Sequence, residues 1–227
     1  MIYYIVAENP DNRALKRARE YINEGEIIVF PTETNWVFAT SPFSKEGVKR
    51  LDQIDIYSSK YLTLICNSIS QASKYAFISD NSYRILKRFL VGPYKFIFNL
   101  HKDSPKVIRS IRKSEKIGIR IPNTILTERL VDCCECPLMT IAATREILLN
   151  HNSDDSSIRY TKEYLEKITS LNSDMVYSYE LEEIFANNIK MLLDPGEFDF
   201  VGPCSVIDFS EEGMPVIVRE GVGKVEF

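Results

Sequence analysis

Residues 27–34 read Ile-Ile-Val-Phe-Pro-Thr-Glu-Thr, and this stretch decides the expected fold. A continuous apolar run of this kind is typical of a central strand that is covered on both faces of a sheet. The run stops at Pro31, because proline has no N–H to donate to a neighbouring strand. Thr32, Glu33 and Thr34 follow at the strand end, where open α/β sheets hold their ligands. The stretch therefore predicts a buried strand that leads into a candidate site.

Two interpretations of the Pro-Thr-Glu-Thr segment are open from the residues alone. Threonine hydroxyls and backbone donors can orient a carboxylate or a phosphate, but a plain Ser/Thr turn explains the same residues. Arg120 and Arg219 each follow a short apolar strand, and arginine is suited to bidentate recognition of phosphate or carboxylate. A salt bridge at the sheet edge is the alternative for both. The sequence has no glycine-rich phosphate loop and no nucleophile elbow.

Strands and helices alternate along the rest of the chain. The mixture predicts the α/β class with a mixed sheet. The polar loop at 150–157 is the only plausible linker, and because it separates a strand from a helix of one sheet we expect a single domain over residues 1–227. The apolar patterns predict strands at 2–6, 27–30, 36–39, 62–66, 94–100, 116–121, 138–142, 206–209 and 216–218, and helices at 11–24, 44–54, 81–90, 125–132, 161–168 and 181–187.

Composition narrows the class of protein. Hydrophobic residues make up 44% of the 227 residues and charged residues 26%, as expected of a folded protein with a core. No apolar run approaches the roughly 18 residues that cross a bilayer, and the N-terminus has no basic flank, so we predict a cytoplasmic protein without a membrane segment. The five cysteines are not spaced as a disulfide framework, and the three at 133, 134 and 136 are interpreted as small apolar residues at a helix end instead of a metal site.

The net charge of −4 is unevenly distributed. Residues 102–120 carry seven cations and only two carboxylates, whereas residues 154–200 are rich in carboxylates. A concentration of cations in one segment is the best candidate for phosphate contacts with RNA, and a solvated helix face is the alternative. The candidate RNA-binding residues are Lys106, Arg109, Arg112, Lys113 and Lys116.

The order of short motifs along the chain resembles the YrdC-like family from end to end. The closing run at 217–223, together with Asn9-Pro10, resembles the YciO branch in particular. The motifs are Pro31-Thr32-Glu33-Thr34, Gly92-Pro93, Gly118-x-Arg120-x-Pro122, Pro203-x-Ser205-Val206-Ile207-Asp208 and Arg219-Glu220-Gly221.

The resemblance implies a fold and an activity. The fold is an open, twisted, mixed sheet flanked by helices around a positively charged concave cleft. Active members condense threonine, bicarbonate and ATP, with Mg²⁺, into threonylcarbamoyl-adenylate and release pyrophosphate. The product serves threonylcarbamoyladenosine synthesis in tRNA, and family members are also associated with double-stranded RNA. The expected partners are therefore threonine, bicarbonate, ATP and tRNA or double-stranded RNA.

By their positions in the matching motifs, some residues of this chain are expected to have the binding roles known in the family. Thr32, Thr34 and Arg120 fall where the family holds threonine. No catalytic residue and no protein-bound metal ligand can be assigned in this way. The expected nucleotide-binding residues are Thr140, Cys204, Ser205 and Arg219.

The sequence also departs from the family pattern. The Lys-x-Arg motif that faces the triphosphate falls on Asp55 and Tyr57, or on Ile54 and Ile56, and neither alignment supplies a cation. Losing two charge-assisted hydrogen bonds should cost roughly 3–6 kcal/mol of nucleotide binding. Further departures are Ala-Ala-Thr at 142–144 for Ser-Ala-Asn, Trp36-Val37-Phe38 for Tyr-Gly-Leu, Val91 for the first proline of Pro-Gly-Pro and Lys95 for the threonine after it.

Three hypotheses follow from these matches and departures. The first is a threonylcarbamoyl-adenylate synthase type of protein with a degraded nucleotide site. The second is a module that binds double-stranded RNA or a nucleotide without synthase activity. The third is an inert scaffold that pairs with another tRNA-modification protein.

Overall fold

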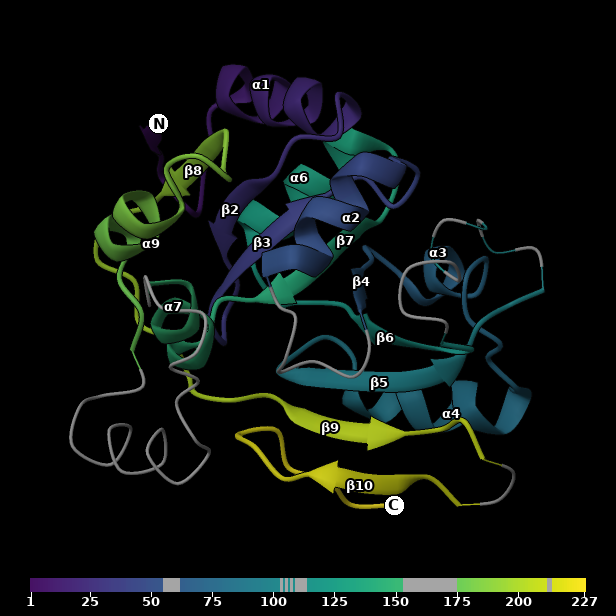
Figure 1. Cartoon of the computed structure of the whole chain (residues 1–227). Helices are drawn as coiled ribbons and strands as arrows, with labels where there is room; N and C mark the ends of the chain where they lie inside the picture. The colour runs from purple at the N-terminus through teal and green to yellow at the C-terminus, as the bar shows by residue number, and fades with distance from the viewer. Residues whose placement is uncertain are drawn as a thin grey trace.

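The computed structural model describes residues 1–54, 62–102, 104, 106, 108, 114–152, 175–211 and 214–227 (Figure 1). Its described strands form one sheet in the order β1-β8-β2-β3-β7-β4-β6-β5-β9-β10. The strands are β1 (Ile2–Tyr4), β2 (Ile28–Pro31), β3 (Trp36–Thr40), β4 (Thr63–Ile65), β5 (Tyr94–Asn99), β6 (Lys116–Arg120), β7 (Leu138–Ala142), β8 (Met191–Asp194), β9 (Ser205–Asp208) and β10 (Val216–Arg219). The described helices are α1 (Asn12–Asn23), α2 (Lys45–Ile54), α3 (Ile69–Ala72), α4 (Asp80–Phe89), α6 (Ile125–Cys134), α7 (Arg145–Asn152) and α9 (Ser178–Phe185).

The sheet is mixed, as the sequence predicts. Parallel pairs join β1 with β8, β2 with β8, β4 with β6 and β5 with β9. The other neighbours are antiparallel, including the hairpin of β2 and β3. Because β2 lies between β8 and β3, its four residues are all buried, which explains the unbroken apolar run.

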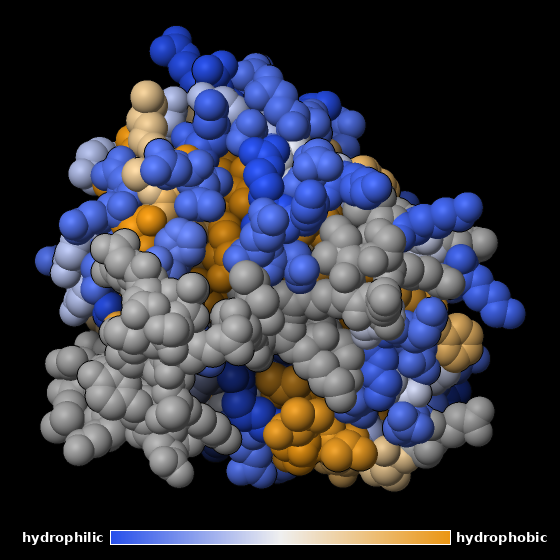
Figure 2. Space-filling model, viewed as in Figure 1, coloured by the Kyte–Doolittle hydropathy of each residue, from blue (hydrophilic) through white to orange (hydrophobic). Residues whose placement is uncertain are grey.

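Two apolar layers sandwich the sheet. Val29 of β2 faces the layer that contains side chains of α2, α4 and α9, whereas Ile28 and Phe30 face the layer beneath α1 and α6. Alternation along the strand therefore sends apolar side chains to both faces. The two layers cover the interior strands, while β10 forms an edge. Figure 2 shows apolar side chains gathered over β9 and β10, where Val216 and Val218 of β10 are exposed.

Local signals in the sequence place the helix ends. Asp11 caps α1 by accepting a hydrogen bond from the backbone N–H of Arg13 at 2.6 Å. The predicted cap Ser44 accepts from the backbone N–H of Gly47 at 3.1 Å, at the start of α2. Gly25 has a φ of +75°, so the prediction of a left-handed glycine after α1 is confirmed.

Three elements were not predicted, and each is short or covered. The four residues of β8 are all buried, so the strand shows no alternation and is hard to distinguish from other apolar runs. The eight residues of α7 extend to Asn152, so the predicted loop at 150–157 begins too early. The third is α3, which has only four residues. The predicted helix at 161–168 lies outside the described residues.

The cysteines occupy the places expected of small apolar residues. All five are free thiols, and Cys134 is buried near the end of α6 while Cys133 and Cys136 are half-buried. Among the residues that the structure describes, no group of three His, Cys, Asp or Glu side chains could hold a metal ion. The same residues contain no helix with the length and apolar character of a membrane span.

Candidate functional site

The turn between β2 and β3 brings two buried hydroxyl groups together. Thr32 is 0% exposed and Thr34 is 7% exposed, and their hydroxyl oxygens lie 3.3 Å apart. The Thr32 hydroxyl donates to the carbonyl of Asn35 at 2.9 Å, and the Thr34 hydroxyl donates to the Asn35 side chain at 3.1 Å. A Ser/Thr turn is therefore present, and Glu33 lies between its two threonines in the sequence.

A buried ion pair connects this turn to the end of β6. Arg120 Nη2 donates to Glu33 Oε1 at 3.1 Å, and the two side chains are only 6% and 11% exposed. The pair is incompletely satisfied, because the other carboxylate oxygen, Glu33 Oε2, and the Arg120 Nε–H are both buried without a hydrogen-bond partner. Buried polar atoms without partners are uncommon and each calls for an explanation, such as a ligand or a water molecule. The pair thus leaves one acceptor and one donor without a hydrogen bond inside the protein.

A polar strip crosses the neighbouring strands on the same face as Arg120. Thr140 of β7 pairs with Thr63 of β4, and Thr63 pairs with Gly118 of β6, two residues before Arg120. Directly paired residues share a face of a sheet, so these positions form one row. The Thr140 hydroxyl is buried and donates to the carbonyl of Thr63 at 3.1 Å.

Lys95 of β5 extends over this row because Gly118 has no side chain. A Cβ atom placed on Gly118 would come within 2.5 Å of Lys95 Cε and 2.9 Å of the Thr63 hydroxyl. The lysine stem therefore crosses β6 toward β4. Lys95 replaces the threonine of the family motif and brings a cation to the strip beside Arg120.

The predicted nucleotide residues near the C-terminus connect the start of β9 with the end of β10 and the segment that follows β10. Arg219 donates to the carbonyl of Cys204 through Nε at 3.1 Å and through Nη2 at 2.7 Å. Ser205 is fully buried, and its hydroxyl donates to the Gly223 carbonyl and accepts from the Gly221 N–H at 2.9 Å. The register of β10 with β9 shifts between Ile217 and Arg219, so Arg219 pairs with Val206, the partner of Lys95, at this irregularity.

The structure describes only part of the predicted RNA-binding segment. Lys106 is exposed, whereas Lys116 lies 3.5 Å from a carboxylate oxygen of Asp208 and 3.4 Å from one of Glu211. Arg109, Arg112 and Lys113 lie outside the described residues, as do Asp55, Ile56 and Tyr57 of the Lys-x-Arg alignments.

Where the site departs from the family pattern, two of the substituted positions serve the local fold. Ile54 is buried at the end of α2. Thr144 accepts a hydrogen bond from the backbone N–H of Ile147 at 3.3 Å and so begins α7. Neither position is an obvious replacement for a lost ligand contact.

Sequence reasoning did not assign a role to Glu33 or Asn35. The available signal was the single carboxylate between two threonines, at a strand end where an arginine was also expected. The pairing itself could not be predicted, because Glu33 and Arg120 are 87 residues apart and meet only in the folded sheet.

The fold and the site together describe an α/β protein with an open mixed sheet and a polar turn paired with a buried arginine. The family model Sua5/YciO/YrdC, described as "Telomere recombination", matches residues 20–221. The chain therefore belongs to the Sua5/YciO/YrdC family. It is 26% identical over 227 residues to the uncharacterized protein YciO of Escherichia coli K12, covering 99% of this chain and 97% of that protein.

Synthases of the family are more distant. The putative threonylcarbamoyl-AMP synthase of Methanocaldococcus jannaschii is 21% identical over 220 residues, covering 96% of this chain and 91% of that protein. The threonylcarbamoyl-AMP synthase of Pyrococcus abyssi is 22% identical, and the match spans 95% of this chain but only 56% of that protein.

Solved structures share the fold. The crystal structure of E. coli YciO matches with a TM-score of 0.74 at 24% identity, covering 100% of this chain and 98% of that one. P. abyssi Sua5 complexed with L-threonine also matches with a TM-score of 0.74, at 22% identity, covering 97% of this chain and 57% of that one. These likenesses confirm the predicted fold class.

Proposed function

We propose that the chain binds L-threonine at the Glu33–Arg120 pair and is a threonylcarbamoyl-AMP synthase type of protein with a weakened nucleotide site. The observation that carries the proposal is the half-satisfied ion pair. A free amino acid offers the complementary groups. Because Arg120 Nε and Glu33 Oε2 are both buried, the site would have to open before the ligand carboxylate could accept from the first and the ligand ammonium donate to the second. The threonine complex of the P. abyssi relative and the synthase relatives support this choice of amino acid.

The reaction requires orientation more than it requires a nucleophilic side chain. Threonine and bicarbonate give a carbamate and water; an oxygen of the carbamate then attacks the α-phosphorus of ATP, and the bond to the leaving pyrophosphate breaks. Arg120 and Glu33 would hold the amino acid while its amine reacts, and positioning of this kind can supply much of a rate enhancement. The substrate's phosphates, together with the Mg²⁺ that accompanies ATP, would approach two cations, Lys95 over the polar strip and Arg219 at the end of β10.

Turnover is expected to be slow. Neither alignment of the Lys-x-Arg motif places a cation near the triphosphate, and one of its positions, Ile54, is buried in the core. We expect threonine- and bicarbonate-dependent pyrophosphate release from ATP below about 1 s⁻¹, the lower end of ordinary enzyme rates. A faster rate would contradict the weakened nucleotide site and leave the synthase assignment in place.

Isothermal titration with L-threonine tests the binding proposal. The wild-type protein should bind L-threonine and release no comparable heat with D-threonine. Glu33→Gln removes the charge that pairs with the ammonium but keeps the shape of the side chain, so it should weaken binding about tenfold or more, since hydrogen bonds to charged groups contribute roughly 1.5–3 kcal/mol. A matched control is Glu20→Gln, which removes an exposed carboxylate paired with Arg17 on α1.

The outcomes separate the hypotheses. Binding of threonine with pyrophosphate release supports a synthase, and threonine or nucleotide binding without release supports a binding module. If wild-type protein binds no L-threonine at 10 mM, about ten times the upper end of common substrate affinities, or if both variants bind it equally well, the proposal is wrong.

A further inference from the structure

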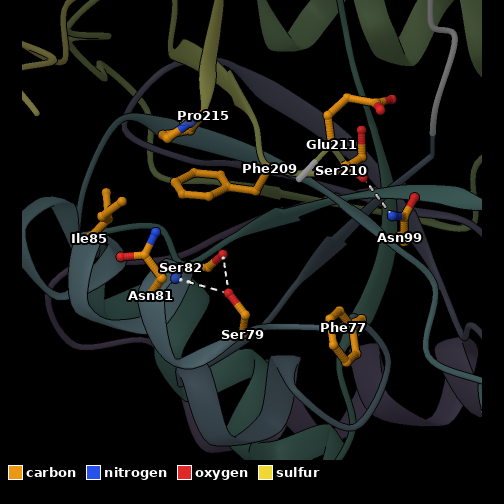
Figure 3. A pocket seen from close by; sticks show the side chains of 10 residues that line it. All are labelled: Phe77, Ser79, Asn81, Ser82, Ile85, Asn99, Phe209, Ser210, Glu211 and Pro215. Atoms are coloured by element: carbon orange, nitrogen blue, oxygen red, sulfur yellow. Dashed lines mark hydrogen bonds between the residues drawn. The ribbon is translucent and has the colours of Figure 1, made fainter. Parts of the chain in front are cut away.

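A hollow lies at the opposite end of strands β5 and β6 from the Glu33–Arg120 pair. It has a volume of about 420 Å³ and is bordered by the first turn of α4, the end of β5 and the segment after β9 (Figure 3). Asn99 at its rim pairs with Lys116, the first residue of β6, whereas Arg120 is the last. The hollow is therefore distinct from the proposed threonine site. Its volume is in the range of small-molecule sites, roughly 300–1,000 Å³.

Two phenyl rings stand on opposite sides of this hollow (Figure 3). Phe209 is held in place, because its ring stacks on Phe98 with centroids 5.2 Å apart and meets Phe96 edge-on at 6.0 Å. Phe77 is 63% exposed, although its backbone is fixed by a hydrogen bond to the Asn99 carbonyl at 2.8 Å. The fixed ring of Phe209 and the exposed ring of Phe77 each offer an apolar surface against which a flat ligand could stack.

The remaining walls carry neutral hydrogen-bonding groups. The Ser210 hydroxyl is buried and has no hydrogen-bond partner, and the exposed side-chain amide of Asn81 makes no hydrogen bond to another described residue. Asn99 donates to the Ser210 carbonyl at 2.7 Å through Nδ2, which leaves its Oδ1 as an acceptor at the rim. Amides and hydroxyls of this kind can both donate and accept.

The lining of the hollow disfavours an anion. Among the described residues that line it, the charged one is Glu211, whereas the nearest charges of α4, Asp80 and Arg84, are of opposite sign. Lys116 lies 3.4 Å from Glu211 and 3.5 Å from Asp208, where carboxylates already surround it. A ligand that places a planar, uncharged group in this hollow fits better than one that places a phosphate there.

We propose that this hollow binds a nucleobase. A nucleobase has a flat face for Phe77 and Phe209 and an edge with adjacent donors and acceptors for Asn81, Asn99 and Ser210. Asparagine amides match base edges well, as their bidentate pairing with adenine shows. The base can come from a free nucleoside or from an unpaired position in a nucleic-acid strand, and the chemistry of recognition is the same.

Ligand-observed NMR and calorimetry with adenosine, guanosine, cytidine, uridine and the corresponding single-stranded hexanucleotides test the proposal. Phe77→Ala should weaken binding about 5- to 150-fold, the range seen when a stacking ring is removed, and Asn81→Ala should change the preference among bases. Phe43→Ala is the matched control, because Phe43 is 52% exposed and lies outside the hollow. L-threonine affinity should be the same in wild type, Phe77→Ala and Asn81→Ala.

Binding of free nucleosides that depends on Phe77 supports a small-molecule ligand, and binding of hexanucleotides alone with the same dependence supports a base within a strand. The proposal is overturned if neither class binds wild-type protein at 10 mM, or if Phe77→Ala and Phe43→Ala weaken binding equally. Neither result bears on the threonine site, which is tested with a different ligand and different residues.

Discussion

At the residue scale, the Glu33–Arg120 pair is the feature that most distinguishes this chain's site. The sequence could place Arg120 and the two threonines at strand ends, because apolar runs stop beside them. It could not show that Glu33 takes the arginine as its partner, since strand order and sheet curvature decide which ends meet. It also could not show that Lys95 crosses a glycine to reach the same face.

Removing Arg120 alone should destabilise the protein more than removing both partners. Arg120→Met leaves the Glu33 carboxylate buried without its cation, which typically costs about 3–5 kcal/mol. The double variant Arg120→Met with Glu33→Gln removes both charges and should recover most of that loss. Urea unfolding of the three proteins measures the difference. Equal destabilisation of the single and double variants would mean that the charge pair is not the cause.

Burial of the Cys66 thiol makes a prediction about alkaline stability. Burial raises the pKa of Cys66 from its ordinary value of 9.0 to about 12. The unfolded chain therefore loses this proton at lower pH than the folded chain does. The stabilisation from the neutral thiol is fully present below about pH 9 and is lost as the pH rises toward 12.

Cys66→Ala should consequently flatten the pH dependence of stability. Between pH 8 and 10.5 the wild type should lose about 2 kcal/mol more of its unfolding free energy than the variant, because each pKa unit corresponds to about 1.4 kcal/mol. Denaturant unfolding at the two pH values measures both slopes, and other titrating groups cancel in the comparison. Parallel slopes for the two proteins would contradict a buried neutral thiol.

At the element scale, apolar runs and the turn signals beside them were enough to predict most of the sheet. Strands with a turn signal at one end, such as β7 at 138–142, were located to the residue. The missed strand β8 lies between β1 and β2, where both faces are buried and the side-chain pattern gives no period. The missed helix α7 depends on a tertiary contact, the ion pair from Arg145 to Glu180 of α9 at 2.6 Å, which no local pattern reveals.

The connection between α1 and β2 should tolerate only glycine at position 25. Gly25 has a φ of +75°, and an added Cβ would lie 2.1 Å from the Ser44 hydroxyl oxygen that caps α2. Gly196 has a similar φ of +82° but no atom within 4 Å of that point. Gly25→Ala should therefore cost the left-handed backbone penalty of roughly 1–2 kcal/mol and about 1–3 kcal/mol more for crowding.

Gly196→Ala is the control that isolates the backbone term, and it should show only the smaller loss. Thermal or urea unfolding of both variants gives the comparison. Equal losses would show that Ser44 moves aside without cost, and that the contact between the two helices is less fixed than the structure indicates.

At the scale of the whole molecule, the fold decides where ligands could bind, and the charge distribution decides where nucleic acid could bind. The ten-stranded sheet of the described residues places the proposed threonine site and the hollow near Phe77 at opposite ends of β5 and β6, so two ligands could bind without competing. The net charge of −4 disfavours general attraction to nucleic acid. An RNA interface would have to be the cationic segment at 102–120, and within it Lys116 already contacts two carboxylates.

The RNA hypothesis predicts salt-dependent binding of a duplex through that segment alone. If about four or five cations reach phosphates, the logarithm of affinity should fall against the logarithm of salt concentration with a slope of roughly −4, using the coefficient for B-form DNA. Replacing Arg109, Arg112 and Lys113 with Ala should flatten the slope by about two to three units and weaken binding of all sequences alike. The matched control replaces Arg13, Lys16 and Arg17, three exposed cations of α1, and should leave the slope unchanged.

Fluorescence anisotropy with a labelled duplex at several salt concentrations measures each slope. Because non-specific complexes usually have dissociation constants of roughly 10⁻⁴–10⁻⁶ M, the absence of binding up to about 1 mM would mean that these cations only balance the acidic second half of the chain.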